Sequence, residues 1–299
     1  MHKNRAMKGL ILAGGSGSRL YPLTEVSSKQ LQAVYDKPMI YYPLTTLIAA
    51  GIKDICIVLT EFDLSRFQKL LKTGKQWGVC INYITQPKPN GIAEALILAE
   101  DFIDGSDCVL ILGDNIFSGG SDIPDAIESF NGGATIFAYH VPDPSNYGVV
   151  EFDINMNVIS LEEKPVTPKS SYAIPGIYIF DKNAPSIAKS IVPSGRGELE
   201  ITDVNLCYLN SGKLKVQRLS RGFAWLDSGN SESLHDASCY IAAIEKRQGV
   251  RIGCPEEAAL VRKFVTVEEL QPVLETMPEC SYRSYILKVS QDYKEGKIL

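Results

Sequence analysis

The regular alternation of short apolar runs with helix-like stretches is the feature that most constrains how this chain can fold. Each run has the length of a strand, and the stretches between the runs carry apolar residues at helical spacing. The predicted strands are Lys8–Ala13, Ile55–Thr60, Ile81–Thr85 and Cys108–Leu112, and the predicted helices are Pro43–Ala50, Ser65–Leu71 and Ile92–Phe102. This order predicts a mostly parallel sheet with helices on both faces. Functional residues are expected directly after the strands, because ligands bind at the carboxyl ends of such sheets.

The pattern changes in the second half of the chain. Strand candidates follow one another closely there, at Ala134–Val141, Val149–Phe152, Val158–Glu163 and Ile177–Phe180. They predict an extension of the sheet with antiparallel members. From Ser231 onward the predicted elements are helices, at Ser231–Gln248, Val267–Thr276 and Ser281–Tyr293. The predicted fold is α/β: a Rossmann-like, mixed, mostly parallel sheet flanked by helices, with a sheet extension and a C-terminal helical region.

The composition is that of a globular protein, since 45% of the 299 residues are hydrophobic and 22% are charged. A net charge of −5 gives no sign of a nucleic-acid surface. The 7 cysteines are scattered and form no C-x-x-C pair, which predicts reduced and mostly buried thiols. No apolar run is long enough to span a bilayer. We therefore expect a cytoplasmic protein that binds neither membrane nor nucleic acid.

A glycine-rich loop follows the first predicted strand. Gly14, Gly15 and Gly17 let the backbone approach a phosphate chain closely, and Arg19 at the end of the loop is suited to bind phosphate oxygens. Three interpretations compete: a P-loop, a dinucleotide-binding turn, and an ordinary strand-to-helix turn. The Gly-Lys-Ser/Thr of a P-loop is absent, and the dinucleotide fingerprint lacks its third glycine. Lys29 adds a second cation, which favours a triphosphate site without excluding the ordinary turn.

Two aspartates stand in similar surroundings far apart in the chain. Asp114 follows the strand Cys108–Leu112, and Asp227 lies between an apolar run and Gly229. A carboxylate at the end of a strand can hold Mg²⁺. Taken singly, each aspartate is equally suited to cap a turn.

The sequence resembles the sugar-phosphate nucleotidylyltransferases through ordered blocks that cover most of the chain. These blocks are Gly9–Leu23, Ser28–Leu44, Gln86–Ala95, Leu112–Phe117, Tyr147–Phe152, Glu162–Pro165, Gly197–Asn205, Ala224–Ser233 and Arg247–Glu257. The resemblance implies the Mg²⁺-dependent transfer of a deoxythymidylyl group from dTTP to glucose 1-phosphate, giving dTDP-glucose and pyrophosphate. Its alternatives are a uridylyltransferase acting on a hexose 1-phosphate and a non-catalytic regulator that binds nucleotide sugars. A dehydrogenase is a further rival, which the incomplete fingerprint weakens.

The resemblance also assigns roles to individual residues. It implies catalytic cations at Arg19, Lys29 and Lys164, and metal ligands at Asp114 and Asp227. It implies nucleotide contacts at Gly14, Gly15, Gly17, Gln30, Gln86 and Gly91. It implies sugar-phosphate contacts at Tyr147, Gly148, Glu163, Lys164 and Tyr178.

The same likeness predicts how the chain is divided. Residues 1–230 would form the catalytic core, with a nucleotide-binding part over about 1–118 and a sugar-binding part over about 119–230. Residues 231–299 would form a helical region packed on that core, of the kind found in homotetrameric members.

The chain also departs from the usual family pattern. Glu94 stands where Gln is usual, with no effect that the sequence explains. Ser118, Gly120 and Val261 differ at positions associated with an effector site. We therefore expect feedback inhibition by a deoxythymidine diphosphate sugar to be weakened or altered.

Overall fold

A twisted β-sheet forms the centre of the protein, which is represented by a computed structural model that describes residues 7–15 and 17–297. Strands β6 (Cys108–Leu112), β1 (Lys8–Ala13), β4 (Asp54–Leu59) and β5 (Cys80–Thr85) lie side by side in that order and are parallel. They match the predicted strands to within a residue at either end. The parallel part of the predicted sheet is thereby confirmed.

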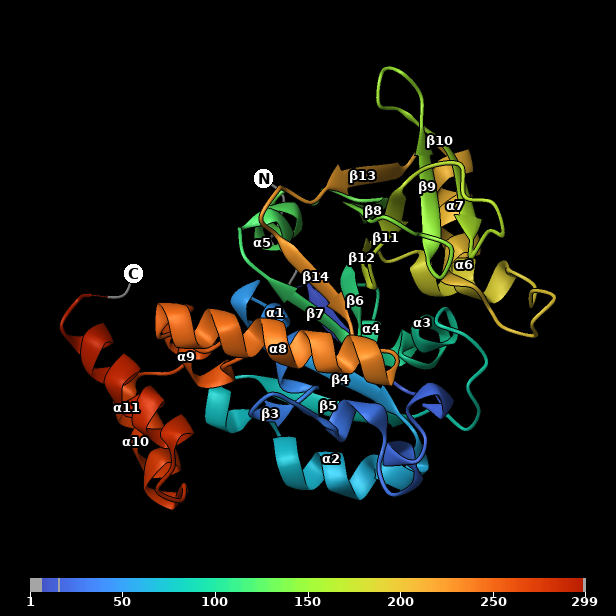
Figure 1. Cartoon of the computed structure of the whole chain (residues 1–299). Coiled ribbons are helices and arrows are strands. Elements are labelled where there is room, and N and C mark those ends of the chain that lie inside the picture. Colours follow the sequence, from blue (N-terminus) through green and yellow to red (C-terminus); the bar gives the residue numbers. More distant parts are fainter. Residues whose placement is uncertain (1–6, 16, 298–299) are drawn as a thin grey trace.

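The sheet continues beyond β6 with mainly antiparallel strands (Figure 1). In order these are β12 (Ile177–Phe180), β8 (Ala134–His140), β11 (Tyr172–Ile174), β9 (Gly148–Phe152) and β10 (Val158–Glu163). Strand β13 (Leu214–Arg218) joins β8 in the parallel sense. The predicted sheet extension is confirmed, although β11 and β13 were not predicted. β11 is only 3 residues long. In β13, polar residues alternate with apolar ones, so that its sequence resembles that of a loop.

Side chains that alternate along the central strands pack against helices on opposite faces of the sheet. Ile11 belongs to one buried layer with α1 (Tyr41–Ala49), α2 (Leu64–Leu71) and α5 (Asp122–Glu128). Its neighbour Leu10 belongs to the other layer. The helices of that second layer are α3 (Glu94–Leu98), α4 (Glu100–Ile103), α6 (Ala184–Ser190) and α7 (Ile201–Asn210).

The prediction of one helix over Ile92–Phe102 is wrong, because the segment folds as two short helices. The backbone leaves the helical region at Ala99, where φ is −90° and ψ is 11°. Neither glycine nor proline marks the break, and the apolar spacing continues across it. The two pieces therefore give the same sequence pattern as one continuous helix.

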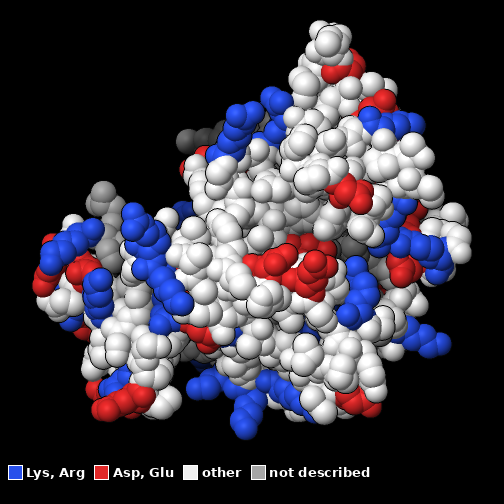
Figure 2. Space-filling view, in the orientation of Figure 1, with Lys and Arg blue, Asp and Glu red and all other residues white. Residues whose placement is uncertain are grey.

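Four helical segments follow the sheet at the end of the described chain: α8 (Ser231–Gln248), α9 (Pro255–Val261), α10 (Val267–Thr276) and α11 (Ser281–Lys294). Helix α8 begins with a capping box formed by Asn230 and Ser233. Helix α9, which was not predicted, packs on α1 and on α11. None of the described helices is both long enough and apolar enough to cross a membrane. On the face shown in Figure 2, acidic and basic side chains are interspersed instead of gathering into one basic surface.

The expectation of mostly buried cysteines is only partly right. Cys56, Cys108 and Cys254 are buried, and burial raises the pKa of the Cys56 and Cys108 thiols to about 12. Three others are exposed: Cys80, Cys239 and Cys280. Apolar neighbours in the sequence did not reveal which thiols face outward on an edge strand or a surface helix.

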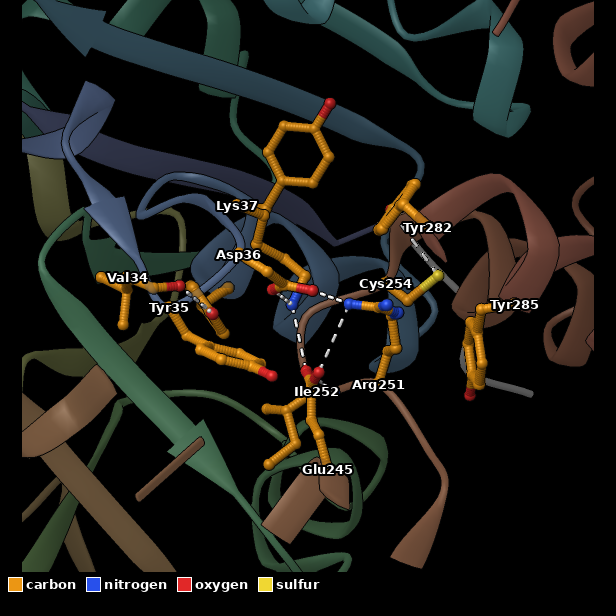
Figure 3. Close-up of polar contacts among 12 residues, drawn as sticks. Val34, Tyr35, Asp36, Lys37, Glu245, Arg251, Ile252, Cys254, Tyr282 and Tyr285 are labelled. Carbon is orange, nitrogen blue, oxygen red and sulfur yellow. Dashed lines mark hydrogen bonds and ion pairs between the residues drawn. The ribbon is translucent and has the colours of Figure 1, made fainter. Parts of the chain in front are cut away.

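A buried ion network joins α8 to a small hairpin made of β2 (Ala33–Val34) and β3 (Lys37–Pro38) (Figure 3). The ammonium group of Lys37 lies 3.1 Å from Glu245 Oε1 and 2.5 Å from Asp36 Oδ1. Arg251 completes the network by binding both Asp36 and Glu245. Only 2% of the Lys37 side chain is exposed. Burial lowers the pKa of Lys37, while the charge of Glu245 opposes that shift.

The hairpin in turn supports the segment that carries Lys29 and Gln30. The N–H of Ile40 donates to the carbonyl oxygen of Gln30 at 2.9 Å, and the N–H of Met39 donates to Gln32 at 2.9 Å. The ion network therefore links the C-terminal helices to a segment that the sequence associates with substrate binding.

Replacement of Lys37 tests this network. We expect Lys37→Met to lower the free energy of unfolding by about 3 kcal/mol, because an uncompensated carboxylate charge would remain buried. Denaturant titration followed by circular dichroism measures the change. Lys189 pairs with Glu100 at the surface, so Lys189→Met serves as a control that should leave the midpoint unchanged. Equal midpoints for the two variants would contradict a stabilising role for the network.

Candidate active site

A cavity of about 300 Å³ opens at the carboxyl ends of β1 and β6, between the parallel sheet and its antiparallel extension. Of the residues assigned a role from the sequence, all but Gly17 line this cavity. Residues from widely separated parts of the chain thus meet at the edge of the sheet where ligands were expected.

The glycine loop brings its backbone close to the side chains on both sides of it. A Cβ atom on Gly14 would lie 2.4 Å from Oε1 of Gln86, so a larger residue cannot stand there without displacing that amide. Gly17 has φ +60°, and its carbonyl oxygen accepts a hydrogen bond of 3.0 Å from Thr24 Oγ1. Gly17 therefore shapes the loop without lining the cavity. Ser16 lies outside the described residues.

Arg19 extends from this loop toward the carboxylates. It belongs to a short 3₁₀ turn, Ser18–Leu20, and is exposed. Its guanidinium group lies 3.0 Å from the position that a Cβ atom on Gly229 would occupy, directly beyond Asp227. Because Arg19 is exposed, its guanidinium group stays hydrated until it contacts an anionic ligand in the cavity.

Asp114 and Asp227 lie side by side because of a two-stranded ribbon. Strand β7 (Asn115–Ser118) pairs with β14 (Ala224–Asp227), and the register places Asp227 opposite Asn115. The N–H of Ser228 donates to the carbonyl oxygen of Asp114 at 3.1 Å. Lys29 forms an ion pair with Asp114 Oδ2.

The two carboxyl groups have opposite pKa shifts. Burial tends to raise the pKa of Asp114, but the charge and hydrogen bond of Lys29, together with the Asn115 amide, outweigh burial and lower that pKa. Burial and the negative charge of Asp114 raise the pKa of Asp227 to about 6. Lys29, Arg19 and Lys164 oppose this rise. Because two adjacent carboxylates repel each other when both are ionised, this arrangement favours a bound cation.

The donor set fits Mg²⁺. Within the described part of the chain, no group of 3 or more His, Cys, Asp and Glu side chains could hold a metal ion. Two adjacent carboxylates, Asp114 and Asp227, are a protein contribution that suits Mg²⁺, whose other ligands are usually water and substrate oxygens.

One side of the cavity is built from the beginning of β9 and the end of β10. Glu163 accepts a hydrogen bond of 2.5 Å from Thr202 Oγ1 and one of 3.4 Å from Arg196 Nη2. Lys164 has φ +44°, and its N–H donates to the carbonyl oxygen of Tyr147 at 3.0 Å. Held in this way, Glu163 can accept hydrogen bonds from hydroxyl groups, and Lys164 can offer a positive charge.

Tyr178 lines the cavity but is mainly a packing residue. It is buried, and its ring stacks on Phe180 with centroids 6.0 Å apart. Burial raises the pKa of its hydroxyl group far above the usual range.

Two amides and a glycine line another part of the cavity. Gln86 follows β5, and Gln30 is almost fully buried. Among the described residues, Oε1 of Gln30 has no hydrogen-bond partner, which makes it available to a ligand. Gly91 has φ +110°, and a Cβ atom there would lie 2.4 Å from the carbonyl oxygen of Leu199. The segment that carries Leu199 thus packs directly against Gly91.

Asn115 is a residue that the sequence did not single out. Its Oδ1 accepts hydrogen bonds from the Gly176 N–H at 2.9 Å and from the Trp225 indole at 2.6 Å. Its Nδ2 donates to Asp114 Oδ1 at 3.0 Å. Its position directly after Asp114 was the only signal in the sequence, because all these partners except Asp114 are distant in the chain.

The sequence model described as nucleotidyl transferase matches residues 8–244. The chain belongs to the nucleotidyl transferase family. The glucose-1-phosphate thymidylyltransferase of Xanthomonas campestris pv. campestris is 48% identical over 95% of this chain and 97% of its own length. The enzyme of that name from Mycobacterium tuberculosis is 49% identical over 95% of this chain and 99% of its own.

Solved structures show the same fold. A glucose-1-phosphate thymidylyltransferase structure from Bacillus anthracis, in complex with a sucrose, has a TM-score of 0.74 and 44% identity, over 79% of this chain and 95% of that one. A UDP-glucose pyrophosphorylase bound to UDP-glucose has a TM-score of 0.71 at 22% identity, over 81% of this chain and 99% of that one. The second likeness concerns the fold alone. The resemblance inferred from the sequence is confirmed.

The repulsion between the two carboxylates can be measured directly. We expect Asp114→Asn to lower the pKa of Asp227 from about 6, because the neighbouring negative charge is removed and Lys29 loses its partner. The carboxyl carbon chemical shift of Asp227, followed through an acidic pH titration without metal, reports this pKa. Asp101→Asn removes an exposed carboxylate on α4 and should leave the titration unchanged. An unaltered titration in Asp114→Asn would show that burial alone sets this pKa.

Proposed function

We propose that the protein transfers a deoxythymidylyl group from dTTP to glucose 1-phosphate, forming dTDP-glucose and pyrophosphate. The observation that carries this proposal is the convergence of two carboxylates and three cations on one cavity. Asp114 and Asp227 lie between Lys29, Arg19 and Lys164, whose charges all act on Asp227. Relatives that share nearly half of their residues along 95% of the chain carry the name of this activity.

The nucleotide occupies the part of the cavity formed by residues of about 1–118. The backbone at Gly14 and Gly15 lies against the phosphates, because a glycine loop turns its N–H groups toward anions, and Gly17 shapes the loop that carries them. Gln86, Gln30 and the backbone at Gly91 contact the base and nucleoside. Side-chain amides suit this role, since they offer both a donor and an acceptor to a base edge.

Glucose 1-phosphate occupies the part formed by residues of about 119–230. Glu163 accepts hydrogen bonds from sugar hydroxyl groups, and the Gly148 backbone lies against the sugar. Tyr147 and Tyr178 form the walls of this pocket. Lys164 binds the sugar phosphate through its exposed ammonium group. The hydrogen bond from the Lys164 N–H to the carbonyl oxygen of Tyr147 fixes the backbone from which this side chain extends.

Chemistry in this cavity requires positioning and charge neutralisation and no general base. A phosphate oxygen of the sugar 1-phosphate is already anionic, and it attacks the α-phosphorus in line. A bond forms between these two atoms as the bond from the α-phosphorus to the bridging oxygen breaks and pyrophosphate leaves. Lys164 orients the attacking phosphate, while Arg19 and Lys29 offset the charge on the triphosphate and the departing pyrophosphate. Asp114 and Asp227 would hold Mg²⁺, which supplies further positive charge to the phosphate oxygens.

The remaining expectations rest on the resemblance alone. They are a cytoplasmic homotetramer and a weakened response to a deoxythymidine diphosphate sugar. Ser118 ends β7, a Cβ atom on Gly120 would contact Phe223, and Val261 is partly exposed at the end of α9. Light scattering and inhibition kinetics measure the two properties, and a monomer or full feedback inhibition would contradict them.

A pyrophosphate-release assay on a panel of nucleoside triphosphates and sugar 1-phosphates tests the proposed activity. We expect the highest kcat/KM for dTTP with glucose 1-phosphate, and no release without added Mg²⁺. A higher kcat/KM for UTP would favour a uridylyltransferase. No release with any pair, despite tight nucleotide-sugar binding, would favour a regulator.

Two substitutions test the assigned cations and carboxylates. We expect Arg19→Ala and Asp114→Asn to fold normally and to lower kcat by about 100-fold or more, because each removes a group that stabilises charge in the transition state. Steady-state kinetics and thermal melts measure the two properties separately. Arg221→Ala and Asp101→Asn change exposed residues of the same types and should retain wild-type rates. Near-normal kcat in either active-site variant would remove that residue from the mechanism.

A further inference from the structure

Glu94 forms two hydrogen bonds at the rim of the nucleotide side of the cavity. It is the first residue of α3. Its Oε2 accepts a hydrogen bond of 2.6 Å from Nε2 of Gln86, and its Oε1 accepts one of 2.7 Å from Nδ2 of Asn90. Both oxygens of the carboxylate therefore engage side-chain amide groups.

This contact fixes the orientation of the Gln86 amide. A carboxylate can only accept hydrogen bonds, whereas an amide presents either an NH₂ group or a carbonyl oxygen. If the Gln86 amide turned over, its oxygen would face a negatively charged oxygen at about hydrogen-bond distance. The amide is therefore held with its NH₂ group on Glu94. The backbone N–H of Gln86 is also held, by the carbonyl oxygen of Leu59 at 2.7 Å.

The free oxygen of the amide lies inside the cavity. Oε1 of Gln86 is 2.4 Å from the position that a Cβ atom on Gly14 would occupy, and both residues line the cavity. In the part of the chain that the structure describes, no group donates a hydrogen bond to this oxygen. The pocket thus offers a ligand an oriented acceptor at this point.

A fixed acceptor selects between bases by their ring nitrogens. N3 of thymine or uracil carries a hydrogen and can donate to Oε1 of Gln86. N3 of cytosine carries a lone pair in the same position, so the two acceptors would repel each other. A site that hydrogen-bonds one ligand discriminates strongly against an analogue that cannot make the bond, because the buried group is left unpaired.

We propose that Glu94 is a positioning residue that strengthens the selection of thymine over cytosine by locking Gln86 as a hydrogen-bond acceptor. This inference rests on the proposed function, in which Gln86 contacts the base. Glu94 touches neither substrate, and its effect acts only through the orientation of the neighbouring amide.

Glu94→Gln tests the proposal with little change in shape. The new amide can either accept from Gln86 or donate to it, so the Gln86 amide is free to turn over. We expect the ratio of kcat/KM for dTTP to kcat/KM for dCTP to fall by about tenfold. The change should appear mainly in KM, because a base contact is equally present in the ground and transition states. kcat for dTTP should stay within about twofold of the wild type.

Two control variants separate this effect from general damage. Glu100→Gln removes an exposed carboxylate on α4, and Asn90→Ala removes the other partner of Glu94 while the carboxylate stays. Both should keep the wild-type ratio. An unchanged ratio in Glu94→Gln, or an equal fall in Asn90→Ala, would overturn the proposal.

A binding measurement distinguishes failure of this inference from failure of the proposed function. If the wild-type protein transferred no nucleotidyl group, the proposed function would fail. Calorimetric dissociation constants for dTTP and dCTP would then still report the selectivity. A weaker preference for dTTP in Glu94→Gln supports the role of Glu94, and an unchanged preference refutes it.

Discussion

The rest of the active site depends on keeping two repelling carboxylates together in a buried place. Asp114 and Asp227 come from segments far apart in the sequence, and the β7–β14 ribbon holds them side by side. Burial, together with the negative charge of Asp114, raises the pKa of Asp227 to about 6, although three cations act against this rise. The pairing of β7 with β14 keeps the two carboxylates adjacent, and a looser arrangement would let them separate and would weaken the preference for a cation.

Asn115 connects the β7–β14 ribbon to its surroundings through the hydrogen bonds of one side chain. It joins the Asp114 carboxylate, the backbone of Gly176 and the indole of Trp225. Trp225 in turn packs against Tyr147, with ring centroids 4.9 Å apart. The surroundings of Asp114 and of Tyr147 are thus coupled through a buried amide whose hydrogen bonds involve both its oxygen and its nitrogen. Such fully satisfied polar networks favour one arrangement over its alternatives.

Local patterns predicted the central strands, the glycine loop and the two aspartates, because a few neighbouring residues are enough to indicate a strand or a tight turn. The other candidate residues came only from the family resemblance. The same patterns merged α3 with α4, since the break at Ala99 has no glycine or proline. They also overlooked Asn115 and left Glu94 unexplained. Such residues act through hydrogen bonds whose geometry depends on how separate segments fold together. Composition and spacing do not indicate that geometry.

The ion network at Lys37 also makes the C-terminal helices part of the support of the hairpin. Glu245 and Arg251 neutralise charges that belong to the hairpin next to the Lys29 segment. A shortened chain that ended after Asp227 would remove Glu245 and Arg251 from the hairpin, and a graft of the helices onto another core would separate these two residues from Lys37 and Asp36. The helices therefore contribute charged side chains that hold the hairpin, and exchange between proteins would require moving both sides of the network together.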